Sequence, residues 1–230
     1  MQAQPERVTG LVPQQICADW LALIERRYST LDRDDPDFSL HSSSLRLRAV
    51  DGLTIDEVLR HLDRDLLGTL TACDVDQCWV RRQYAPHRAP PHHAPHSWHQ
   101  DGALSFDFAT HAGKPPPGDA LLEMLTCWIP LTPCGIDAPG LEFVVAPLTH
   151  LLAPHELMPT QVAARYPASA FERPALNPGD ALLLPGGTLH RTHVTPSMTH
   201  DRTSIELRFF KPQPLPERLR GDRFVCALRG

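Results

Sequence analysis

Histidines are concentrated in one stretch of the sequence, and that stretch ends at an aspartate. From residue 85 to residue 102 the chain reads APHRAPPHHAPHSWHQDG. In a β-strand, residues two apart point to the same face, so His99 and Asp101 would project together while Gln100 points away. An imidazole and a carboxylate at this spacing can bind one metal ion if a third protein ligand comes from elsewhere. The spacing therefore predicts part of a metal site.

A candidate for the third ligand lies in GDALLLPGGTLHRTHVTP, residues 179–196. His190 follows an apolar strand and a Gly-Gly kink, whereas His193 would face the opposite side of the same strand. Two histidines and one carboxylate form the facial triad of non-heme Fe(II) oxygenases, which leaves one face of an octahedral metal open. An isolated His-x-Asp also arises by chance or from core hydrogen bonds, so the triad is a hypothesis at this point.

The other histidines of the stretch alternate with prolines and have no strand spacing. We interpret them as loop residues that are solvated or incidental. They are His87, His92, His93 and His96.

A cation beside the predicted triad would suit an anionic ligand. Residues 191–210 read as two strands joined by a turn, and folding about this turn would place Arg202 opposite His190, at about 5 Å between Cβ atoms. Arg208 has the same parity but would pair farther from the metal. A guanidinium near an open metal position can hold a carboxylate with two hydrogen bonds, and Thr192 would add a hydroxyl from the face of His190. The alternative for Arg202 is an ordinary surface ion pair.

Residues for a substrate pocket are harder to select. Several arginines near the predicted mouth would suit an acidic substrate, although each would equally be solvated or ion-paired. Phe106 and Phe108 would wall an apolar pocket or alternatively face the core. The arginines are Arg81, Arg82, Arg88 and Arg191. From these residues the candidates chosen for the substrate pocket are Arg82, Phe106 and Arg191.

The elements that must position these residues are helices first and strands later. Helical spacing is expected over 14–28, where Ile16, Trp20, Leu23 and Ile24 form one stripe, and over 54–70. The second helix opens with Thr and Glu at the spacing of a capping box, and a short strand is expected between the two helices at LRLRAV. Short β-prone segments bounded by turn residues then follow. They cover residues 76–84, 123–131, 140–147, 180–186 and 202–210.

This order predicts a mainly β fold with flanking helices, a sandwich or barrel, in a single domain over residues 1–230. Residues 1–72 would form a mainly helical part packed on the barrel, and residues 74–212 the barrel core. Loop insertions are expected at 103–119 and 151–178, and within the first of these the polar segment 107–119 is long enough to be a lid.

The composition excludes several classes of protein. The chain has 230 residues, 42% of them hydrophobic, and a formal net charge of −5 without a basic stripe, which argues against a nucleic-acid partner. Its apolar runs are too short to span a bilayer, and the first residues do not resemble a signal peptide. The 6 cysteines are scattered, which predicts reduced thiols in a cytoplasmic protein. The alternative for Cys73 and Cys78 is half of a zinc site.

The segments that carry the candidate residues resemble the phytanoyl-CoA dioxygenase-like branch of the Fe(II)/2-oxoglutarate-dependent oxygenases. Four blocks in the expected order carry the resemblance. They are SWHQDG (97–102), LTCWIPLTPCGIDAPGLEFVVAPLTH (125–150), NPGDALLLPGGTLHRTH (177–193) and DRTSIELRFF (201–210). Two details depart from the family: APLTH replaces the usual Pro-Gly-Ser-His turn, and the spacing from His190 to Arg202 is one residue longer.

The resemblance implies a double-stranded β-helix, which is a jelly-roll or cupin-like barrel with a metal at its open mouth. It implies Fe(II) as the metal and 2-oxoglutarate and O2 as cosubstrates. Arg202 would hold the distal carboxylate of 2-oxoglutarate with the help of Thr192, and Trp128 would border this cosubstrate. The implied iron ligands are His99, Asp101 and His190.

The implied reaction hydroxylates or desaturates an unactivated C–H bond of a small molecule while 2-oxoglutarate is decarboxylated to succinate and CO2. Halogenases of this class lack the carboxylate ligand, so Asp101 argues against halogenation. Two other classes are weighed against this enzyme. A metal-dependent cupin isomerase or hydrolase would leave Arg202 unexplained, and a non-catalytic jelly-roll binding module would leave the intact triad unexplained.

Overall fold

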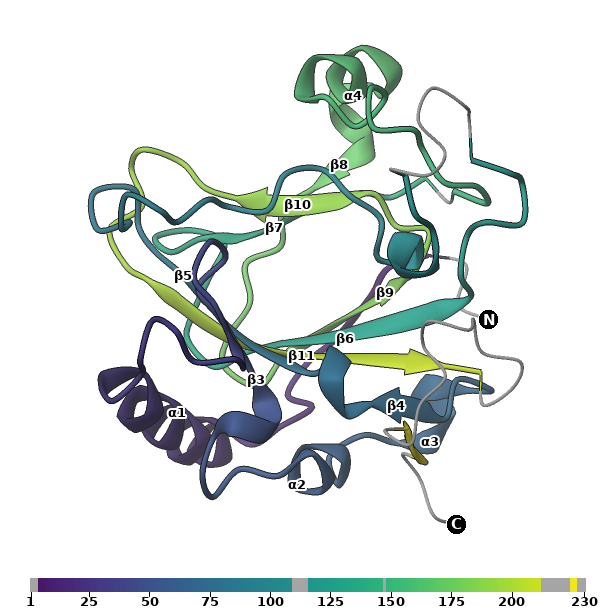
Figure 1. Cartoon of the computed structure of the whole chain (residues 1–230). Helices are drawn as coiled ribbons and strands as arrows, with labels where there is room; N and C mark the ends of the chain where they lie inside the picture. Colours follow the sequence, from purple (N-terminus) through teal and green to yellow (C-terminus); the bar gives the residue numbers. More distant parts are fainter. Residues whose placement is uncertain (1–3, 109–115, 147, 212–223, 227–230) are drawn as a thin grey trace.

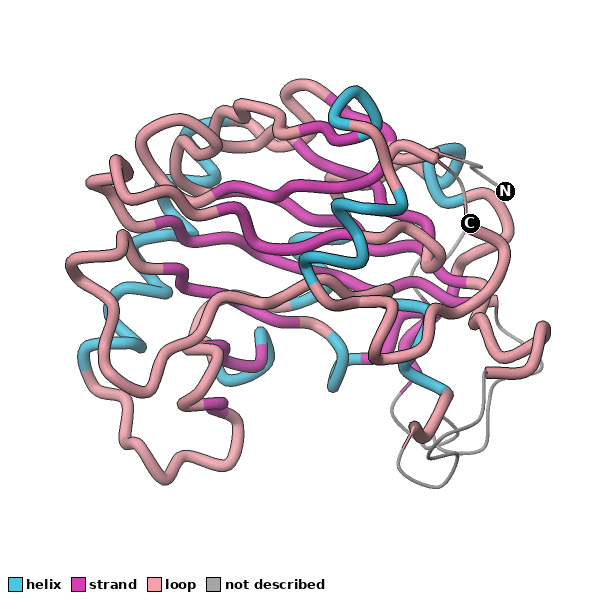
Figure 2. The backbone as a smooth tube through the Cα atoms, turned by 90° about the horizontal axis from the view of Figure 1, so that it is seen from above, coloured by secondary structure: helices cyan, strands magenta, loops and turns pink. Residues whose placement is uncertain are grey.

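Two antiparallel sheets face each other and enclose the centre of the molecule (Figure 1). The computed structural model describes residues 4–108, 116–146, 148–211 and 224–226. The 9-stranded sheet has the order β1-β9-β6-β11-β5-β3-β2, with β4 and β12 attached beside β11, and the 3-stranded sheet has the order β10-β7-β8. Figure 2, seen from above, shows the strands running side by side with long loops around them. The predicted mainly β, jelly-roll class is confirmed.

The elements have the following bounds. The large sheet contains β1 (Glu6–Val8), β2 (Phe38–Ser39), β3 (Ser44–Arg46), β4 (Ala72–Asp74), β5 (Trp79–Gln83), β6 (Met124–Pro130), β9 (Ala181–Pro185), β11 (Arg202–Phe210) and β12 (Phe224–Cys226). The small sheet contains β7 (Gly140–Val144), β8 (Phe171–Glu172) and β10 (His190–His193). The helices are α1 (Gln14–Ser29), α2 (Ile55–Leu59), α3 (Arg64–Leu67) and α4 (Pro159–Arg165).

The main hydrophobic core lies outside the barrel, between the large sheet and the N-terminal helices. Strand β11 shows why. Its side chains alternate, and Ile205, Leu207 and Phe209 pack in one cluster with residues of α1, α2 and α3, which lie beneath the large sheet in Figure 1. Four of the alternate residues of β11 face the other sheet and are polar, yet they are buried. They are Arg202, Ser204, Glu206 and Arg208.

The first predicted helix is confirmed, with Trp20 and Ile24 fully buried on its inner stripe. The second prediction, one helix over 54–70, is wrong, because α2 ends at Leu59 and α3 begins at Arg64. The N-terminal cap is as expected, since the Thr54 hydroxyl accepts the Glu57 N–H at 3.2 Å. A new helix begins after Asp63, whose carboxylate accepts the N–H of the residue two positions on, and such a side chain competes with helix continuation.

All five predicted β segments form strands, β5, β6, β7, β9 and β11, and the short strand expected at LRLRAV begins as β3. The hairpin predicted over residues 191–210 is wrong. β10 pairs with β7 in the small sheet, whereas β11 pairs with β5, β6 and β4 in the large sheet. The turn between the two strands therefore crosses from one sheet to the other.

The N-terminal third is less helical than predicted, because β1, β2 and β3 add strands to the large sheet. The insertion at 151–178 contains α4, which lies beyond β8 above the small sheet (Figure 1). Most of the predicted lid falls at 109–115, outside the described residues. No helix in the described part of the chain is long and apolar enough to cross a membrane.

The five cysteines with described side chains are buried and form no disulfide. The Sγ atoms of Cys73 and Cys78 lie 3.4 Å apart. Among the described residues, no further histidine, cysteine or carboxylate joins them in a potential metal-binding group. Their closeness is therefore explained by core packing, and the alternative of half a zinc site finds no support.

Candidate metal centre

The two segments that carry the predicted metal ligands lie directly against each other. His99 and His190 form an antiparallel bridge, in which each backbone N–H donates to the other residue's carbonyl at 2.9 and 3.0 Å. Farther along, the Gly102 N–H donates to the Gly186 carbonyl at 2.8 Å. The Gly-Gly kink before His190 therefore places that histidine beside the His-x-Asp segment.

Glycine is required where these segments meet. A Cβ added to Gly102 would lie 2.5 Å from a methyl group of Leu121 and 2.9 Å from the Gly186 carbonyl oxygen. A Cβ on Gly186 would lie 2.8 Å from the Leu122 carbonyl oxygen. Because backbone atoms cannot move aside as a flexible side chain can, the lack of side chains at Gly102 and Gly186 allows the ligand-bearing segments to approach.

The three predicted ligands converge with their ligand atoms within 4.8 Å of one another. Nδ1 of His99 contacts the Ser97 carbonyl at 2.7 Å, and Nδ1 of His190 contacts the Thr188 carbonyl at 2.9 Å. A carbonyl can only accept, so Nδ1 carries the hydrogen in each ring, and in the neutral form of the ring Nε2 keeps a free lone pair. These Nε2 atoms lie 3.8 and 3.7 Å from the Asp101 carboxylate. Such a donor set fits an iron site.

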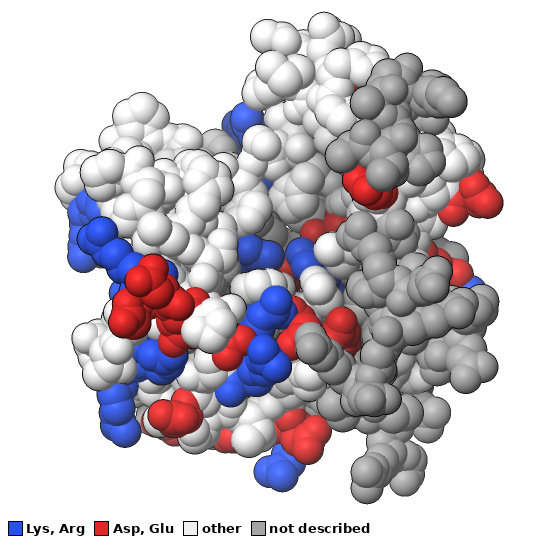
Figure 3. Space-filling model, viewed as in Figure 1, with Lys and Arg blue, Asp and Glu red and all other residues white. Residues whose placement is uncertain are grey.

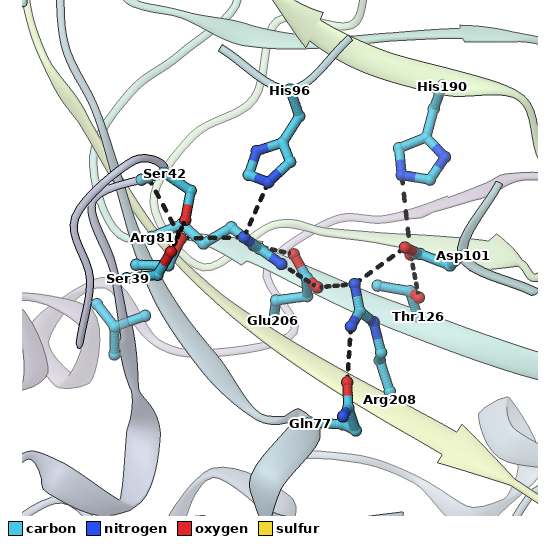
Figure 4. Close-up of polar contacts among 12 residues, drawn as sticks. Ser39, Ser42, Gln77, Arg81, His96, Asp101, Thr126, His190, Glu206 and Arg208 are labelled. Carbon is cyan, nitrogen blue, oxygen red and sulfur yellow. Dashed lines mark hydrogen bonds and ion pairs between the residues drawn. The ribbon is translucent and has the colours of Figure 1, made fainter. Parts of the chain in front are cut away.

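Asp101 is held on both of its oxygens (Figure 4). Oδ2 accepts the Thr126 hydroxyl at 2.6 Å, and Oδ1 accepts Nη2 of Arg208 at 2.9 Å. Burial alone would raise the pKa of Asp101, but Arg208, the two imidazoles and Thr126 outweigh it and hold this pKa well below its ordinary value. Burial and the neighbouring His190 lower the pKa of His99 to about 4. At neutral pH the site thus offers an ionised carboxylate and a neutral His99 imidazole.

Arg202 shares one cavity with the triad, although not through the predicted hairpin. It is 2% exposed, and its guanidinium lies 4.9 Å from the ring centre of Trp128 and donates to the Gly140 carbonyl at 3.3 Å. Its Nε has no hydrogen-bond partner, and no carboxylate of the described residues forms an ion pair with it. Burial lowers the pKa of Arg202 to about 10, so it still carries its charge. Thr192 and Trp128 line the same cavity.

The three candidates for the substrate pocket do not line this cavity. The Arg82 guanidinium stacks 4.1 Å from the ring centre of Tyr28 and pairs with Glu25 on the outer face of the sheet. Arg191 pairs with Glu142, on the strand face opposite to His190. Phe106 packs edge-on against Phe108, with ring centres 4.7 Å apart. Arg82 lies on the outer face because Val80, two residues before it, faces the helical core and residues two apart in a strand share a face.

Several residues of the site were missed or misjudged from the sequence. Arg208 lies closer to the predicted metal ligands than the assumed hairpin predicts, with Nη2 2.9 Å from Oδ1 of Asp101. β6 lies beside β11 instead and brings Thr126 opposite Arg208. Arg81 and His96, which the sequence analysis names without selecting them for the site, also line the cavity, as does Glu206, which it does not name.

The interpretation of the proline-histidine loop as solvated is also partly wrong. His87 is exposed, but His93 lies between Ser43 Oγ at 3.0 Å and Gln83 Nε2 at 2.7 Å. His96 lines the cavity, and its ring centre is 5.7 Å from that of His99. Burial and the charge of Arg81 lower the pKa of His96 to about 3, so its ring is neutral at physiological pH. The loop therefore contributes a wall of the site.

The family model described as Phytanoyl-CoA dioxygenase (PhyH) matches residues 7–200. The chain belongs to the PhyH family. Among curated proteins no sequence matches this PhyH member. The match also covers the N-terminal helices, which the resemblance seen in the sequence did not clearly include.

Solved structures share the fold of this PhyH protein at low sequence identity. The non-heme alpha ketoglutarate dependent epimerase SnoN from nogalamycin biosynthesis is 16% identical, with 99% of this chain and 95% of that chain covered and a TM-score of 0.59. The carbocyclase SnoK from the same biosynthesis is 15% identical, with coverages of 97% and 92% and a TM-score of 0.60. HygX from Streptomyces hygroscopicus, with nickel and 2-oxoglutarate bound, is 14% identical, with coverages of 97% and 92% and a TM-score of 0.59.

Proposed function

We propose that the protein is a non-heme Fe(II)- and 2-oxoglutarate-dependent dioxygenase that hydroxylates or desaturates an unactivated C–H bond of a small molecule. The carrying observation is the joint placement of Arg202 and the triad. A buried guanidinium without a carboxylate partner shares one cavity with two imidazoles and a carboxylate. A buried charge is stable only when it is paired, so Arg202 calls for an anionic ligand beside the metal position.

Each residue of the site has a defined part in this proposal. His99, Asp101 and His190 hold Fe(II), and the Nδ1 contacts to backbone carbonyls fix both imidazoles in the required orientation. Arg202 and Thr192 hold the distal carboxylate of 2-oxoglutarate, and the Trp128 ring shields that contact from water. Iron with 2-oxoglutarate and O2 bound supplies an oxidant strong enough for C–H bonds, with succinate and CO2 as coproducts.

Membership of the PhyH family and the fold shared with HygX, whose structure contains nickel and 2-oxoglutarate, support the proposal. The structures with the same fold include an epimerase and a carbocyclase, so the outcome at the substrate carbon is a separate question from cosubstrate use. A cytoplasmic location and a small-molecule substrate belong to the proposal as well. Acidic and basic groups are mixed over the face seen in Figure 3, and the proposal includes no nucleic-acid partner.

An anaerobic titration of metal-free protein with Fe(II) and then 2-oxoglutarate tests this function. We expect the visible metal-to-ligand charge-transfer band in the wild type and no band in Asp101→Ala. Arg202→Met should retain Fe(II) but require at least about tenfold more 2-oxoglutarate, because the ligand loses a charge-assisted contact. Arg191→Met removes an arginine that pairs with Glu142 away from the cavity and is the matched control.

Product analysis completes the test. Wild-type protein with O2 should release succinate from 2-oxoglutarate, faster in the presence of a substrate found by screening. Metal binding without any band or succinate would favour a metal-dependent cupin isomerase or hydrolase. Absence of metal binding would favour a non-catalytic module.

A further inference from the structure

The described residues of the site carry one positive charge too many. Three guanidinium groups lie in or directly behind the cavity, and two carboxylates lie among them. The charges are Arg81, Arg202 and Arg208 against Asp101 and Glu206. A divalent metal and dianionic 2-oxoglutarate together add no net charge. The excess of one positive charge therefore persists when both are bound.

Among the described residues, the two carboxylates have different numbers of arginine partners, because Asp101 pairs with Arg208 alone and Glu206 pairs with both Arg81 and Arg208. Arg208 lies between them, 2.9 Å from Asp101 and 2.7 Å from Glu206 (Figure 4). Glu206 also receives Nε of Arg81 at 2.5 Å and Nη2 at 3.0 Å. Two guanidinium groups thus compete for one carboxylate, and of these two only Arg81 lines the cavity.

Arg81 lines the cavity and is fixed in place by its neighbours. Its Nη1 donates to Ser44 Oγ at 3.0 Å and lies 3.4 Å from Nε2 of His96, while its guanidinium carbon lies 5.7 Å from the Trp79 ring centre. The side chain is 14% exposed. Nε and one hydrogen of Nη2 are used by Glu206, and Nη1 is used by Ser44 and His96, so the second hydrogen of Nη2 keeps the capacity to donate to a further acceptor. A guanidinium N–H beside the His96 ring can donate a charge-assisted hydrogen bond to a carboxylate oxygen.

We propose that Arg81, together with His96, binds a second carboxylate of the reacting complex, distinct from the one held by Arg202. This carboxylate comes either from an acidic small-molecule substrate or from the metal-proximal end of 2-oxoglutarate. The inference rests on the proposed oxygenase function, since the ligand of Arg202 is taken to be 2-oxoglutarate. It also explains why Arg81, although paired with Glu206, lies at the cavity surface beside His96, whose ring is next to that of His99.

The test uses two pairs of probes that differ only in charge, benzoate with benzamide and hexanoate with hexanamide. Each is titrated into anaerobic protein loaded with Fe(II) and saturating 2-oxoglutarate, by calorimetry and by the shift of the charge-transfer band. The variants are Arg81→Gln, which removes the charge, and Arg81→Lys, which keeps the charge without the guanidinium group. Arg82→Gln is the matched control, because that neighbouring arginine lies on the outer face with Glu25.

If the substrate carries the carboxylate, wild-type protein and Arg82→Gln bind the carboxylates at least about tenfold more tightly than the amides. Arg81→Gln loses this preference and Arg81→Lys keeps part of it, with the affinity for 2-oxoglutarate unchanged. If 2-oxoglutarate supplies the carboxylate, Arg81→Gln weakens 2-oxoglutarate by about tenfold instead, and no probe preference exists in the wild type.

Unchanged affinity for 2-oxoglutarate in Arg81→Gln, combined with equal binding of carboxylates and amides by the wild type, would overturn the inference. If Arg81→Gln does not fold, as judged by circular dichroism, the probe preference and the 2-oxoglutarate affinity of Arg81→Lys are compared with those of the wild type instead. Failure of the proposed function is a different result: the wild type then shows no charge-transfer band at all, while calorimetry still reports whether the probes bind.

Discussion

Nη2 of Arg208 lies 2.9 Å from Oδ1 of Asp101, and the Thr126 hydroxyl occupies the other oxygen of the same carboxylate. Gln77 Oε1 in turn accepts from Nη1 of Arg208 at 2.9 Å. The orientation of the carboxylate in the proposed metal site is therefore fixed from the large sheet, although Asp101 itself follows the segment that bridges to the small sheet.

Removal of this arginine should weaken the metal site. In Arg208→Met, Asp101 and Glu206 lose the cation between them, so the two buried carboxylates repel each other and a proton competes with the metal. We expect a loss of about 10- to 100-fold in affinity for Co(II) or Fe(II), as found for outer partners of metal ligands. Calorimetric metal titration checks this result, and Arg208→Lys should recover part of the affinity. Wild-type affinity in Arg208→Met would show that Thr126 alone orients Asp101.

The contact between Gly102 and the Gly-Gly kink should be equally sensitive. Gly102→Ala places a Cβ 2.9 Å from the Gly186 carbonyl oxygen, so the two ligand-bearing segments must separate. We expect about 1–3 kcal/mol less stability in chemical unfolding and a weaker metal site. Gly118→Ala is the control, because its added Cβ meets nothing within 4 Å. Equal effects of the two substitutions would contradict the packing argument.

The buried carboxylate of Glu206 makes stability depend on pH. Burial raises its pKa, but Arg81 and Arg208 outweigh burial and lower the pKa to about 2, whereas an unfolded glutamate titrates near about 4.3. Ionised Glu206 therefore stabilises the fold above about pH 4.3, and this contribution is lost as the pH falls toward about 2. Unfolding free energies measured from pH 6 downward should fall less steeply below about pH 4.3 in Glu206→Gln than in the wild type.

The exposed Glu25 provides the comparison for that experiment. Glu25→Gln removes a carboxylate that pairs with Arg82 at the surface, where screening by water keeps the energy of a pair small. Its pH profile should therefore follow the wild type. Identical profiles for Glu206→Gln and the wild type would mean that the two arginines do not stabilise the ionised form.

The thiols should resist modification until the protein unfolds. Burial raises the pKa of Cys17 and Cys134 to about 11 and that of Cys127 to about 12, and the hydrogen bond with Cys73 and burial raise that of Cys78. Because only the thiolate reacts, a disulfide reagent at pH 8 should label these cysteines slowly in native protein and rapidly in guanidinium. The side chain of Cys226 is not described, so fast labelling of one thiol in native protein agrees with this expectation. Fast labelling of more than one thiol would contradict it.

The sequence predicts those parts of the site that depend on residues close together in the chain. His99 and Asp101 follow from strand parity over three residues, and His190 follows from its place after a Gly-Gly kink. Both patterns are local, and the structure brings these three residues together as expected. The assumed hairpin selected Arg202, the resemblance to a family implied its role toward 2-oxoglutarate, and the structure places it in the same cavity.

The rest of the site depends on which strands become neighbours, and sequence alone gives little information about this. Arg202 and Arg208 were positioned by assuming a hairpin between consecutive strands. Their actual neighbours are β5 and β6, which precede them by 70 or more positions, so the predicted register had no basis. The choice of Arg82 over Arg81 shows the same limit at a smaller scale. A shift of one residue moves a side chain to the other face of the sheet.

Strand β11 divides two requirements between alternate residues. Ile205, Leu207 and Phe209 attach the N-terminal helices to the sheet, while Arg202, Glu206 and Arg208 determine the charge around the proposed metal. A substitution at an inward position therefore leaves the face that holds the molecule together untouched. Single substitutions at these inward positions can therefore change which ligand the cavity binds while the residues that stabilise the fold stay the same.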